Sequence, residues 1–516
     1  MIDFDHNREC VIYKELSEEK RKYWFDYKKT KNLRNVDNLY YTVKLKENFL
    51  LDTKDPKVLS LRSYFEKKKS ELLSGSYESV PFFLPDFGNL NLIKRTFQGI
   101  YKYWLECPDF FSIIIAPVVP HSADGDSVTP EIYVQIRSYL IWMYGLHEAF
   151  QKSYAYVQAI IKFFGLSIDF VTENRIDFCW HTNYFLNPEK YFNPESIFKR
   201  QVSRFKGFFF HAVPIGSENY TVDYVAAGKK GNGLFFRIYN KTKEVIELGY
   251  KSWFFDVWLL SGLINHYDYY CYELAYKFES SKFSKFDYLN IARLHWYLEN
   301  GSDDLSKETC SFYIHQYEKY HLVGDDILKF VDKITPKLNM IVNVEYALGR
   351  RLTKTFDFVP FHHITNKRDY KEASRVYDVM DNGYILGNFL LEHIFKLVEG
   401  SDSHKYRRPL SPFWASLVRT KSFDFKKTPS GAKLKRIHLR ELNEEKIRKK
   451  VISSMVSLSL YHKGINDDDF SQDFIDTMGL TFNDNDLAYG NFVKKRRINT
   501  LSPDFKKLER KQDHYH

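Results

Sequence analysis

Residues 235–241 read FFRIYNK, and their side chains predict a β-strand with two different faces. Successive side chains on a strand point to opposite sides of the sheet. Arg237, Tyr239 and Lys241 therefore share one face, and the apolar Phe236 and Ile238 lie on the other. A tyrosine between an arginine and a lysine places a nucleophile beside two cations that suit phosphate.

Two other segments show the same alternation. Residues 175–181 (RIDFCWH) place Asp177 and His181 on one face of a strand. Residues 271–277 (CYELAYK) likewise place Glu273 on one face of theirs, opposite the apolar residues. If the three strands are neighbours in one sheet, these side chains come together beside the tyrosine. Two carboxylates and an imidazole suit a divalent cation, Mg²⁺ or Mn²⁺, with open coordination positions. The alternative is three ordinary half-exposed strands with surface ion pairs.

The whole chain predicts the α+β class, with a central antiparallel β-sheet, flanking helices and a helical C-terminal part. Its 516 residues, 44% of them hydrophobic, suffice for a sizeable core without disulfides. We expect a charged helical N-terminal region (1–75), a β-rich domain (76–280), a helical continuation (281–400) and a basic C-terminal region with a disordered end (401–516). Helices are expected over 58–73, 132–150 and 287–300, among others.

The positive charge lies mostly in one segment. The chain has a formal net charge of +10, and residues 401–450 hold 15 Lys/Arg against 5 Asp/Glu. The first 400 residues are therefore nearly neutral. This segment predicts sequence-independent contacts to the phosphates of a nucleic acid. The residues expected to make them are Lys426, Lys427, Lys433, Lys435, Arg436 and Arg440. A solvated basic face without a partner is the alternative.

Several classes of protein are excluded by the same sequence. No run of 18 or more uncharged apolar residues is present, so no membrane-spanning helix and no membrane partner are expected. The first residues, MIDFDHNREC, contain acids and no apolar core, so we expect no secretory signal. The five cysteines form no CxxC pair, which argues against a zinc ribbon and a disulfide framework. A reducing cytoplasm fits best.

The order of the three motifs resembles a known family. RIDxxxH, then FFRIYNK followed by Glu244, then CYELAYK is similar to the replication initiation factor family of the Rep_trans type. Its members are rolling-circle replication initiators of plasmids and phages, and related relaxases. The family pattern is an Arg-hydrophobic-Asp strand, an Arg-hydrophobic-Tyr-Asp/Asn-Lys strand with a later Glu, and a Val/Tyr-Glu strand. The resemblance covers 175–277, about a fifth of the chain.

The resemblance assigns a role to each matching residue. Tyr239 is expected to be the nicking tyrosine, with Arg237 and Lys241 at the scissile phosphate. Asp177 and Glu273 are expected to hold the metal. The other matching positions are Arg175, which opens the first motif, and Glu244, the acid after the tyrosine.

This sequence also departs from the family at three positions. His181 stands where plasmid members have an acid, and Cys271 stands where the third motif often has an arginine. The serine of the turn before the tyrosine is missing from residues 228–232 (GKKGN). An imidazole still binds a metal such as manganese, so the identity of the metal is left open.

The family implies a metal-dependent enzyme that nicks and recloses DNA in the cytoplasm of a bacterial host. It binds a double-stranded origin, cuts an exposed single strand and stays joined to the 5′ phosphate through Tyr239. The freed 3′-hydroxyl then primes a host polymerase while a host helicase unwinds the duplex. A homodimer is one option for its assembly.

Three alternatives remain open at the level of sequence. A relaxase that starts conjugative or mobilisation transfer uses the same chemistry. A non-catalytic DNA-binding protein on the same scaffold is suggested by the departures at His181 and Cys271. A structural or interaction protein with an accidental resemblance is the third.

Overall fold

The computed structural model describes most of the chain in two units. The described residues are 32–75, 77–120, 129–185, 194–205, 207–215, 219–229, 233–249, 251–279, 284–321, 323–358, 367–420 and 435–436, together with 451 and 454. The first unit comprises residues 1–354 and 358–434, and the second comprises 355–357 and 435–516. In the second unit, β13 (Phe356–Asp357) pairs antiparallel with β15 (Lys435–Arg436).

The first unit is built on one antiparallel sheet, which has 11 strands in the described residues. Their order is β2-β3-β4-β5-β6-β1-β7-β12-β11-β10-β9. The strands are β1 (Asn32–Leu45), β2 (Ser79–Leu84), β3 (Gly88–Ile93), β4 (Tyr103–Cys107), β5 (Phe111–Ile115), β6 (Ile132–Ile136), β7 (Ile168–Thr182), β9 (Phe208–Ile215), β10 (Asn219–Gly228), β11 (Leu234–Asn240) and β12 (Val342–Gly349). The short strands β8 (Gln201–Ser203) and β14 (Phe395–Leu397) form a separate pair.

Helices surround the sheet within this unit. They are α3 (Pro56–Ser74), α4 (Ser138–Tyr144), α5 (Leu146–Phe163), α7 (Pro194–Arg200), α8 (Lys241–Leu248), α9 (Trp253–Leu260), α10 (His266–Lys277), α11 (Leu289–Asn300), α12 (Asp304–Tyr320), α13 (Asp325–Ile334), α14 (Arg350–Thr353), α15 (Lys367–Asp381), α16 (Gly383–Phe389), the π-helix η1 (Leu390–Ile394), the 3₁₀-helix η2 (Lys405–Arg407) and α17 (Pro412–Arg419). Among the described residues, no helix combines the length and apolar character needed to cross a bilayer.

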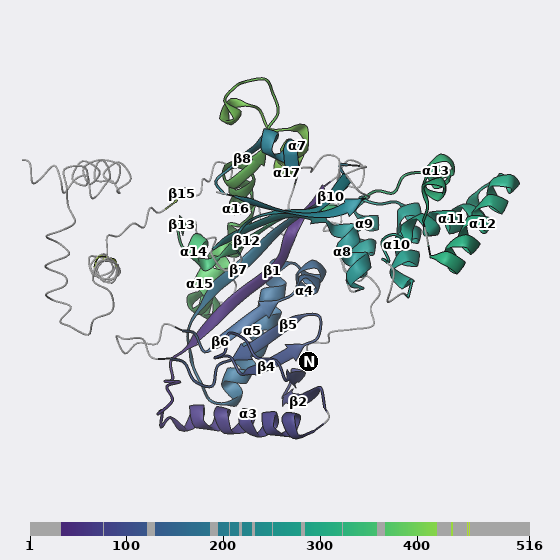
Figure 1. Ribbon diagram of the computed structural model, residues 1–516. Coiled ribbons are helices and arrows are strands. Elements are labelled where there is room, and N and C mark those ends of the chain that lie inside the picture. Colours follow the sequence, from purple (N-terminus) through teal and green to yellow (C-terminus); the bar gives the residue numbers. More distant parts are fainter. Residues whose placement is uncertain are drawn as a thin grey trace, which may run out of the picture. The chain divides into compact units, whose positions relative to one another are not determined.

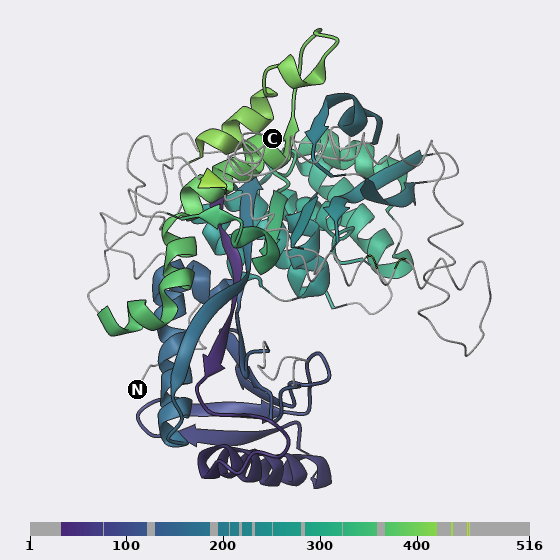
Figure 2. The ribbon, with the colours of Figure 1, turned by 90° about the vertical axis from the view of Figure 1, so that its left-hand side faces the viewer.

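The two long strands β1 and β7 join the two halves of the sheet. They pair along nearly their whole length, from Asn32 opposite Thr182 to Leu45 opposite Ile168. Strand β6 lies on the other side of β1, and β12 lies on the other side of β7. Figures 1 and 2 show β1 and β7 running side by side through the first unit. This pairing aligns the side chains of β1, β7, β12 and β11 in rows across the sheet.

The sheet has one apolar and one polar face in this region. The apolar face presents alternate residues such as Phe178, Trp180, Phe236 and Tyr346, all fully buried. Helix α15 lies along β7 on this side (Figure 1). The ring of Phe236 stacks 4.3 Å from that of Phe395. This side is therefore the hydrophobic core, and the opposite face is left for polar residues.

The α+β class with a large antiparallel sheet is confirmed. So are the strands predicted over 175–181 and 235–241, which lie in β7 and β11. The expected helix over 58–73 is α3, and that over 287–300 is α11. The predicted helix over 132–150 is wrong at its start, because Ile132–Ile136 is β6, with four of its five side chains buried hydrophobics of the core.

The strand predicted over residues 271–277 is also wrong, because this segment is the second half of α10. A capping box starts the helix: Asn265 accepts from the backbone N–H of Asp268, and the Asp268 carboxylate accepts from that of Asn265. The buried residues then recur at the helical spacing of Asp268, Tyr272 and Ala275. The sheet instead takes β1 and β12, from outside the range 76–280.

Candidate functional site

Three neighbouring strands place the polar side chains in one row. In the register of β11 with β12, Arg237 lies opposite Glu345 and Tyr239 lies opposite Asn343. In the register of β12 with β7, Glu345 lies opposite Cys179. Directly opposite residues in antiparallel strands share a face, so Arg237, Tyr239 and Glu345 meet on the polar face.

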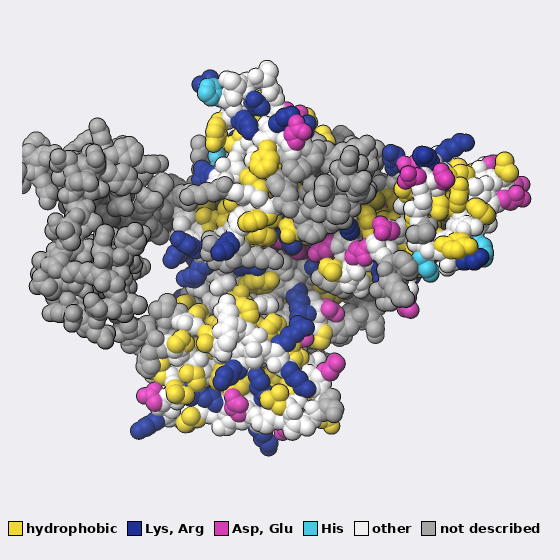
Figure 3. Space-filling view, in the orientation of Figure 1, with side chains coloured by type: hydrophobic (Ala, Val, Ile, Leu, Met, Phe, Trp, Pro, Cys, Tyr) yellow, Lys and Arg dark blue, Asp and Glu magenta, His cyan; other side chains and the backbone are white. Residues whose placement is uncertain are grey.

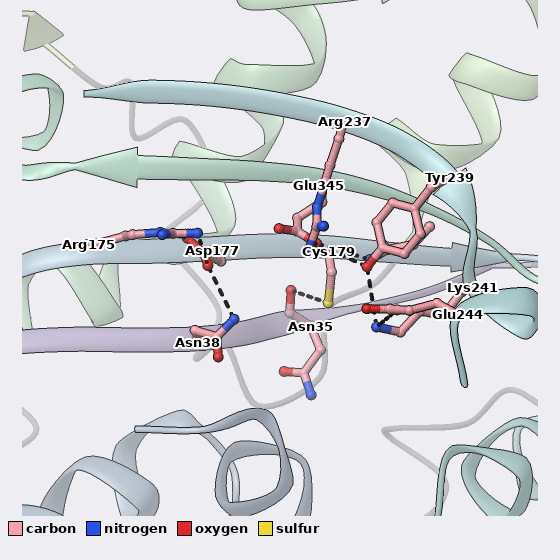
Figure 4. A network of polar contacts seen from close by, with 11 residues as sticks. Asn35, Asn38, Arg175, Asp177, Cys179, Arg237, Tyr239, Lys241, Glu244 and Glu345 are labelled. Atoms are coloured by element: carbon pink, nitrogen blue, oxygen red, sulfur yellow. Dashed lines mark hydrogen bonds and ion pairs between the residues drawn. The ribbon is translucent and has the colours of Figure 1, made fainter. Parts of the chain in front are cut away.

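The hydroxyl of Tyr239 is the centre of this polar cluster. It donates a hydrogen bond to Glu345 Oε2 at 3.2 Å. It accepts from Lys241 Nζ at 3.2 Å and from Asn343 Nδ2 at 2.9 Å. Arg237 Nη2 donates to the same Glu345 oxygen at 2.8 Å, and its guanidinium lies 4.5 Å from the centre of the Tyr239 ring (Figure 4). The tyrosine proton therefore points at a carboxylate, and two cations flank the tyrosine.

Lys241 is held at the junction of β11 and α8. Asn240 caps the helix by accepting from the backbone N–H of Lys243 at 3.0 Å. The ammonium of Lys241 is fully buried and lies 2.5 Å from Glu244 Oε2. Burial alone would lower the pKa of Lys241, but its interactions with the Tyr239 oxygen and with the carboxylates of Glu244 and Asp37 raise that pKa well above its ordinary value. Lys241 is therefore charged at any physiological pH.

Tyr239 itself is neutral in this arrangement. Its side chain is buried, with 8% of its surface exposed. Burial raises the pKa of the Tyr239 hydroxyl well above 10, although Lys241 opposes the shift. A neutral phenol is a weak nucleophile, so it needs a proton acceptor within hydrogen-bond reach. Glu345 Oε2 is in that position.

Asp177 and Arg175 form an ion pair further along the same row. Arg175 Nε and Nη2 donate to the two oxygens of Asp177 at 2.6 and 2.8 Å, and Asn38 Nδ2 donates at 3.2 Å. Burial raises the pKa of Asp177 to about 6 against the lowering effect of Arg175, and the negative charge of Glu345 adds to the rise. Figure 4 places this pair at one end of the row and the tyrosine cluster at the other.

His181 is enclosed by aromatic rings. Its ring stacks on Trp142 at 5.1 Å, and its Nδ1 accepts from Trp258 Nε1 at 3.1 Å. Burial lowers the pKa of His181 to about 3, so the imidazole is neutral. With Nδ1 accepting, the proton must reside on Nε2. A ring with one nitrogen engaged and the other protonated has no lone pair for a metal, so His181 does not fit the predicted ligand role in this arrangement.

Glu273 is separated from the row by its place in α10. It is partly exposed, pairs with Lys277 at 3.4 Å and lines a different cavity, beside Trp253 and Tyr276. The predicted set of Asp177, His181 and Glu273 is therefore not brought together. Within the described residues, no three His, Cys, Asp or Glu side chains are grouped so as to hold a metal ion.

The structure adds residues that the sequence interpretation missed. Glu345 and Asn343 belong to β12, whose sequence VNVEYALG alternates apolar residues with Asn343 and Glu345. This alternation of apolar with polar residues is the sequence signal that could have indicated the strand.

Asp37 is a further buried acid near the cluster. It occupies a β-bulge of β1, between Val36 and Asn38, with 2% of its surface exposed. Burial would raise the pKa of Asp37, but the positive charges of Lys251 and Lys241 outweigh this and lower it to about 2. Asp37 therefore contributes a negative charge that offsets the buried ammonium of Lys241.

The residues predicted to bind DNA through the basic segment are outside the described part of the chain. This applies to Lys426, Lys427, Lys433 and Arg440. For Lys435 and Arg436 only the backbone is described, in β15. Their contacts with DNA stay a prediction.

Comparison with known proteins gives a likeness to solved structures but not to any family model. No family model matches the sequence, and no curated protein matches it. Among solved structures, the chain is similar to a rolling-circle replication initiator protein from Geobacillus stearothermophilus, at 12% sequence identity and a TM-score of 0.29. The match covers 75% of this chain and 95% of that chain. Because a TM-score of this size carries no inference, the function proposed below rests on the residues of this chain.

Proposed function

We propose that this protein is a DNA nicking-closing enzyme that starts rolling-circle replication through a covalent bond to Tyr239. One observation carries the proposal. The Tyr239 hydroxyl donates a hydrogen bond to Glu345 at 3.2 Å, and the buried ammonium of Lys241 lies 3.2 Å from the hydroxyl oxygen of Tyr239. A nucleophile, a proton acceptor and a cation thus converge on one atom.

The proposed reaction uses these groups in one step. The Tyr239 oxygen attacks the phosphorus of a phosphodiester as its proton passes to Glu345 Oε2. The new bond between phosphorus and the tyrosine oxygen forms while the bond to the 3′-oxygen breaks, and that oxygen takes up a proton from water. Lys241 offsets the charge that develops on the phenol oxygen, and Arg237 binds the phosphate. Attack of a 3′-hydroxyl on the phosphotyrosine reverses the step and rejoins the strand.

The arrangement of charges supports access by a phosphate from the side of Arg237. Its side chain is 31% exposed, whereas the side chains of Lys241 and Glu345 are 0% and 2% exposed. Arg237 is thus the first cation of the cluster that an entering anion meets. Because Arg237 now pairs with Glu345 at 2.8 Å, phosphate binding would draw it away and leave Glu345 free to accept the proton.

In this proposal the partners are an origin in double-stranded DNA, an exposed single strand, and a host helicase and polymerase that extend the freed 3′-hydroxyl. A requirement for Mg²⁺ or Mn²⁺ belongs to the same proposal. The predicted ligands do not converge, so no step above is assigned to the metal. Repeating the nicking assay in EDTA measures the requirement.

The test is a search for a covalent adduct. The full chain is incubated with supercoiled DNA of its own replicon and Mg²⁺ or Mn²⁺, and protein joined to a 5′ phosphate is detected on a denaturing gel. Tyr239→Phe is expected to abolish the adduct and to retain DNA binding. Tyr224→Phe is the matched control, because Tyr224 lies directly opposite Tyr239 on β10 and is 40% exposed.

The outcomes of this test distinguish the proposed function from the alternatives. Loss of the adduct in Tyr224→Phe but not in Tyr239→Phe would move the nucleophile to β10. A protein that binds the DNA and forms no adduct with either metal is a DNA-binding protein without this activity. A relaxase forms the same adduct, and transfer of the replicon between cells identifies it.

A further inference from the structure

A second cavity lies on the polar face, next to the Tyr239 cluster along the same strands. Its volume is about 460 Å³, and Arg175, Phe235 and Ala347 are among the residues that line it. On β11 and β12, Phe235 and Ala347 precede Arg237 and follow Glu345 by two residues, and they lie directly opposite each other. Two strand residues span about 7 Å. A DNA strand that runs along β11 to Tyr239 from this side would pass over the cavity.

Four cationic side chains line the cavity and no carboxylate does so among its described lining residues. The cations are Arg175, Lys229, Arg350 and Arg351. Lys229, Arg350 and Arg351 are exposed. In the space-filling view, Lys and Arg side chains gather over the region of α14 and α15 (Figure 3). Arg175 is paired with Asp177, so the net positive charge at the rim comes from Lys229, Arg350 and Arg351. This charge attracts an anion such as a phosphate.

Aromatic rings form the other wall. The rings of Phe97 and Tyr133 lie 4.9 Å apart, and those of Tyr133 and Tyr40 lie 6.1 Å apart. The Arg175 guanidinium lies 5.3 Å from the centre of the Tyr40 ring. Phe97 is half-buried and Gln98 beside it is exposed. Unpaired bases stack on such rings, and amides such as those of Gln98 and Gln135 can bond a base edge.

Two glycines fix the arginines at the rim. Gly349 N donates to Gly233 O at 2.9 Å, which holds the start of α14 against the turn before β11. Gly233 has a φ of +89°, and a Cβ there would lie 3.1 Å from Arg351 Cβ. The close approach therefore requires glycine at 233. It places Arg350 and Arg351 beside the aromatic wall, at a separation that the backbone sets.

We propose that this cavity holds one unpaired nucleotide of the DNA strand, with its base against Phe97, Tyr133 and Tyr40 and its phosphate at Arg350, Arg351 and Lys229. The inference rests on the proposed function, since it names the substrate class of the same face. It adds that the enzyme binds a base on the same face of the sheet, about 13 Å along β11 from Tyr239, so the bound strand is single-stranded at that nucleotide.

The test separates base contacts from phosphate contacts in the full chain carrying Tyr239→Phe, which cannot form the adduct. Fluorescence anisotropy measures the affinity for a 12-nucleotide oligo(dT) and for an abasic strand of the same length. Oligo(dT) is expected to bind roughly tenfold more tightly. Phe97→Ala is expected to remove most of this preference, and Phe97→Tyr to retain it.

The arginines are tested with the same two strands. Arg350→Gln with Arg351→Gln is expected to weaken both strands equally and to lower the salt slope of binding by about 1.4, the value for two phosphates on a single strand. Lys329→Gln with Lys333→Gln, two exposed lysines of α13, is the charge-matched control and is expected to change neither.

Three results would overturn the inference. They are an abasic strand that binds as well as oligo(dT), arginine variants that behave like the α13 control, and tighter binding of oligo(U) than of oligo(dT). Thermal unfolding of each variant shows whether it is folded. These binding results do not depend on the adduct, so the cavity and the nicking activity can fail separately.

Discussion

Glu345 is the residue on which the proposed chemistry depends most directly after Tyr239. One oxygen of its carboxylate, Oε2, accepts a hydrogen bond from the Tyr239 hydroxyl and another from the Arg237 guanidinium. An amide of the same shape keeps the packing but is a poor proton acceptor. Glu345→Gln is therefore expected to slow adduct formation by roughly 100-fold or more, with DNA binding within about twofold.

Glu273→Gln provides the matched comparison, because Glu273 is the acid that sequence reasoning placed at the site. It is paired with Lys277 on α10 and partly exposed. Single-turnover adduct formation is expected to change less than twofold in this variant. Equal slowing in Glu273→Gln and Glu345→Gln would argue that α10 contributes to the site and that the assignment of Glu345 is wrong.

The burial of His181 predicts a pH dependence of stability. Burial lowers the pKa of His181 to about 3 from an ordinary 6.5. The unfolded chain therefore binds a proton between pH 6.5 and about 3 that the folded chain does not, so stability falls as the pH falls through this window. Asp177 acts in the opposite sense. Burial raises its pKa to about 6, so the folded chain holds a proton there that the unfolded chain has lost, and this contribution to stability disappears as the pH rises towards 6.

The comparison of variants isolates the histidine. Between pH 7 and pH 5, the wild type is expected to lose about 2 kcal/mol more of its free energy of unfolding than His181→Gln, measured by urea titration. His315→Gln, whose side chain is 73% exposed, is expected to follow the wild type. Parallel pH curves for the wild type and His181→Gln would show that the imidazole is not held neutral.

At the scale of elements, α16 approaches β1 through a glycine. A Cβ on Gly387 would overlap sterically with the Arg34 guanidinium, which is fully buried. Arg34 donates to Asn388 Oδ1 at 2.6 Å and to Tyr384 O at 2.8 Å, so it has little freedom to move. Gly387→Ala is expected to cost about 1–3 kcal/mol of stability by overpacking.

Thermal unfolding measures this cost. Gly207→Ala serves as the control, because nothing lies within 4 Å of a Cβ built on Gly207. The expected shift of the melting temperature is several degrees downward for Gly387→Ala and close to zero for Gly207→Ala. An unchanged melting temperature in Gly387→Ala would mean that Arg34 can leave its partners at little cost.

The elements also show how much the sequence could predict. Alternation found β7 and β11, because their polar residues face the site while their apolar residues face the core. It missed β12, whose eight residues are buried except Gly349 and lie in a region rich in helices. It read α10 as a strand, because a helix that is buried along one side can also alternate over seven residues. The spacing of Asn265 and Asp268, a helix-start signal, was the better guide.

The site was predictable to the same extent as its strands. One short segment brings four of the site residues together, because all four lie within seven positions of one another: Arg237, Tyr239, Lys241 and Glu244. Glu345 lies 106 residues from Tyr239, and only the pairing of β11 with β12 brings it to the hydroxyl. His181 fitted a metal by residue type alone, and the aromatic rings that enclose it come from α4 and α9.

At the scale of the whole molecule, the proposed function assigns DNA binding to two separate groups of cations. The Tyr239 cluster balances its own charges, since Arg237 and Lys241 are matched by Glu345 and Glu244. In the proposed function, long-range attraction to a duplex is the role of the basic segment 401–450, where 15 Lys/Arg stand against 5 Asp/Glu. The proposed contacts to a single nucleotide come from a few side chains at the cavity that Phe235 and Ala347 line.

This division predicts separable effects. Neutralising Lys433, Lys435 and Arg436 together to Gln is expected to weaken binding to duplex and single strand alike and to lower the salt slope on a duplex by about 2 to 3. The preference for oligo(dT) over an abasic strand is expected to stay, because base stacking at the cavity does not involve these cations. Lys329, Lys333 and Lys337, three exposed lysines, give the triple-Gln control. An unchanged salt slope would show that the basic segment is only a solvated surface, and a lost base preference would show that the segment reaches the cavity.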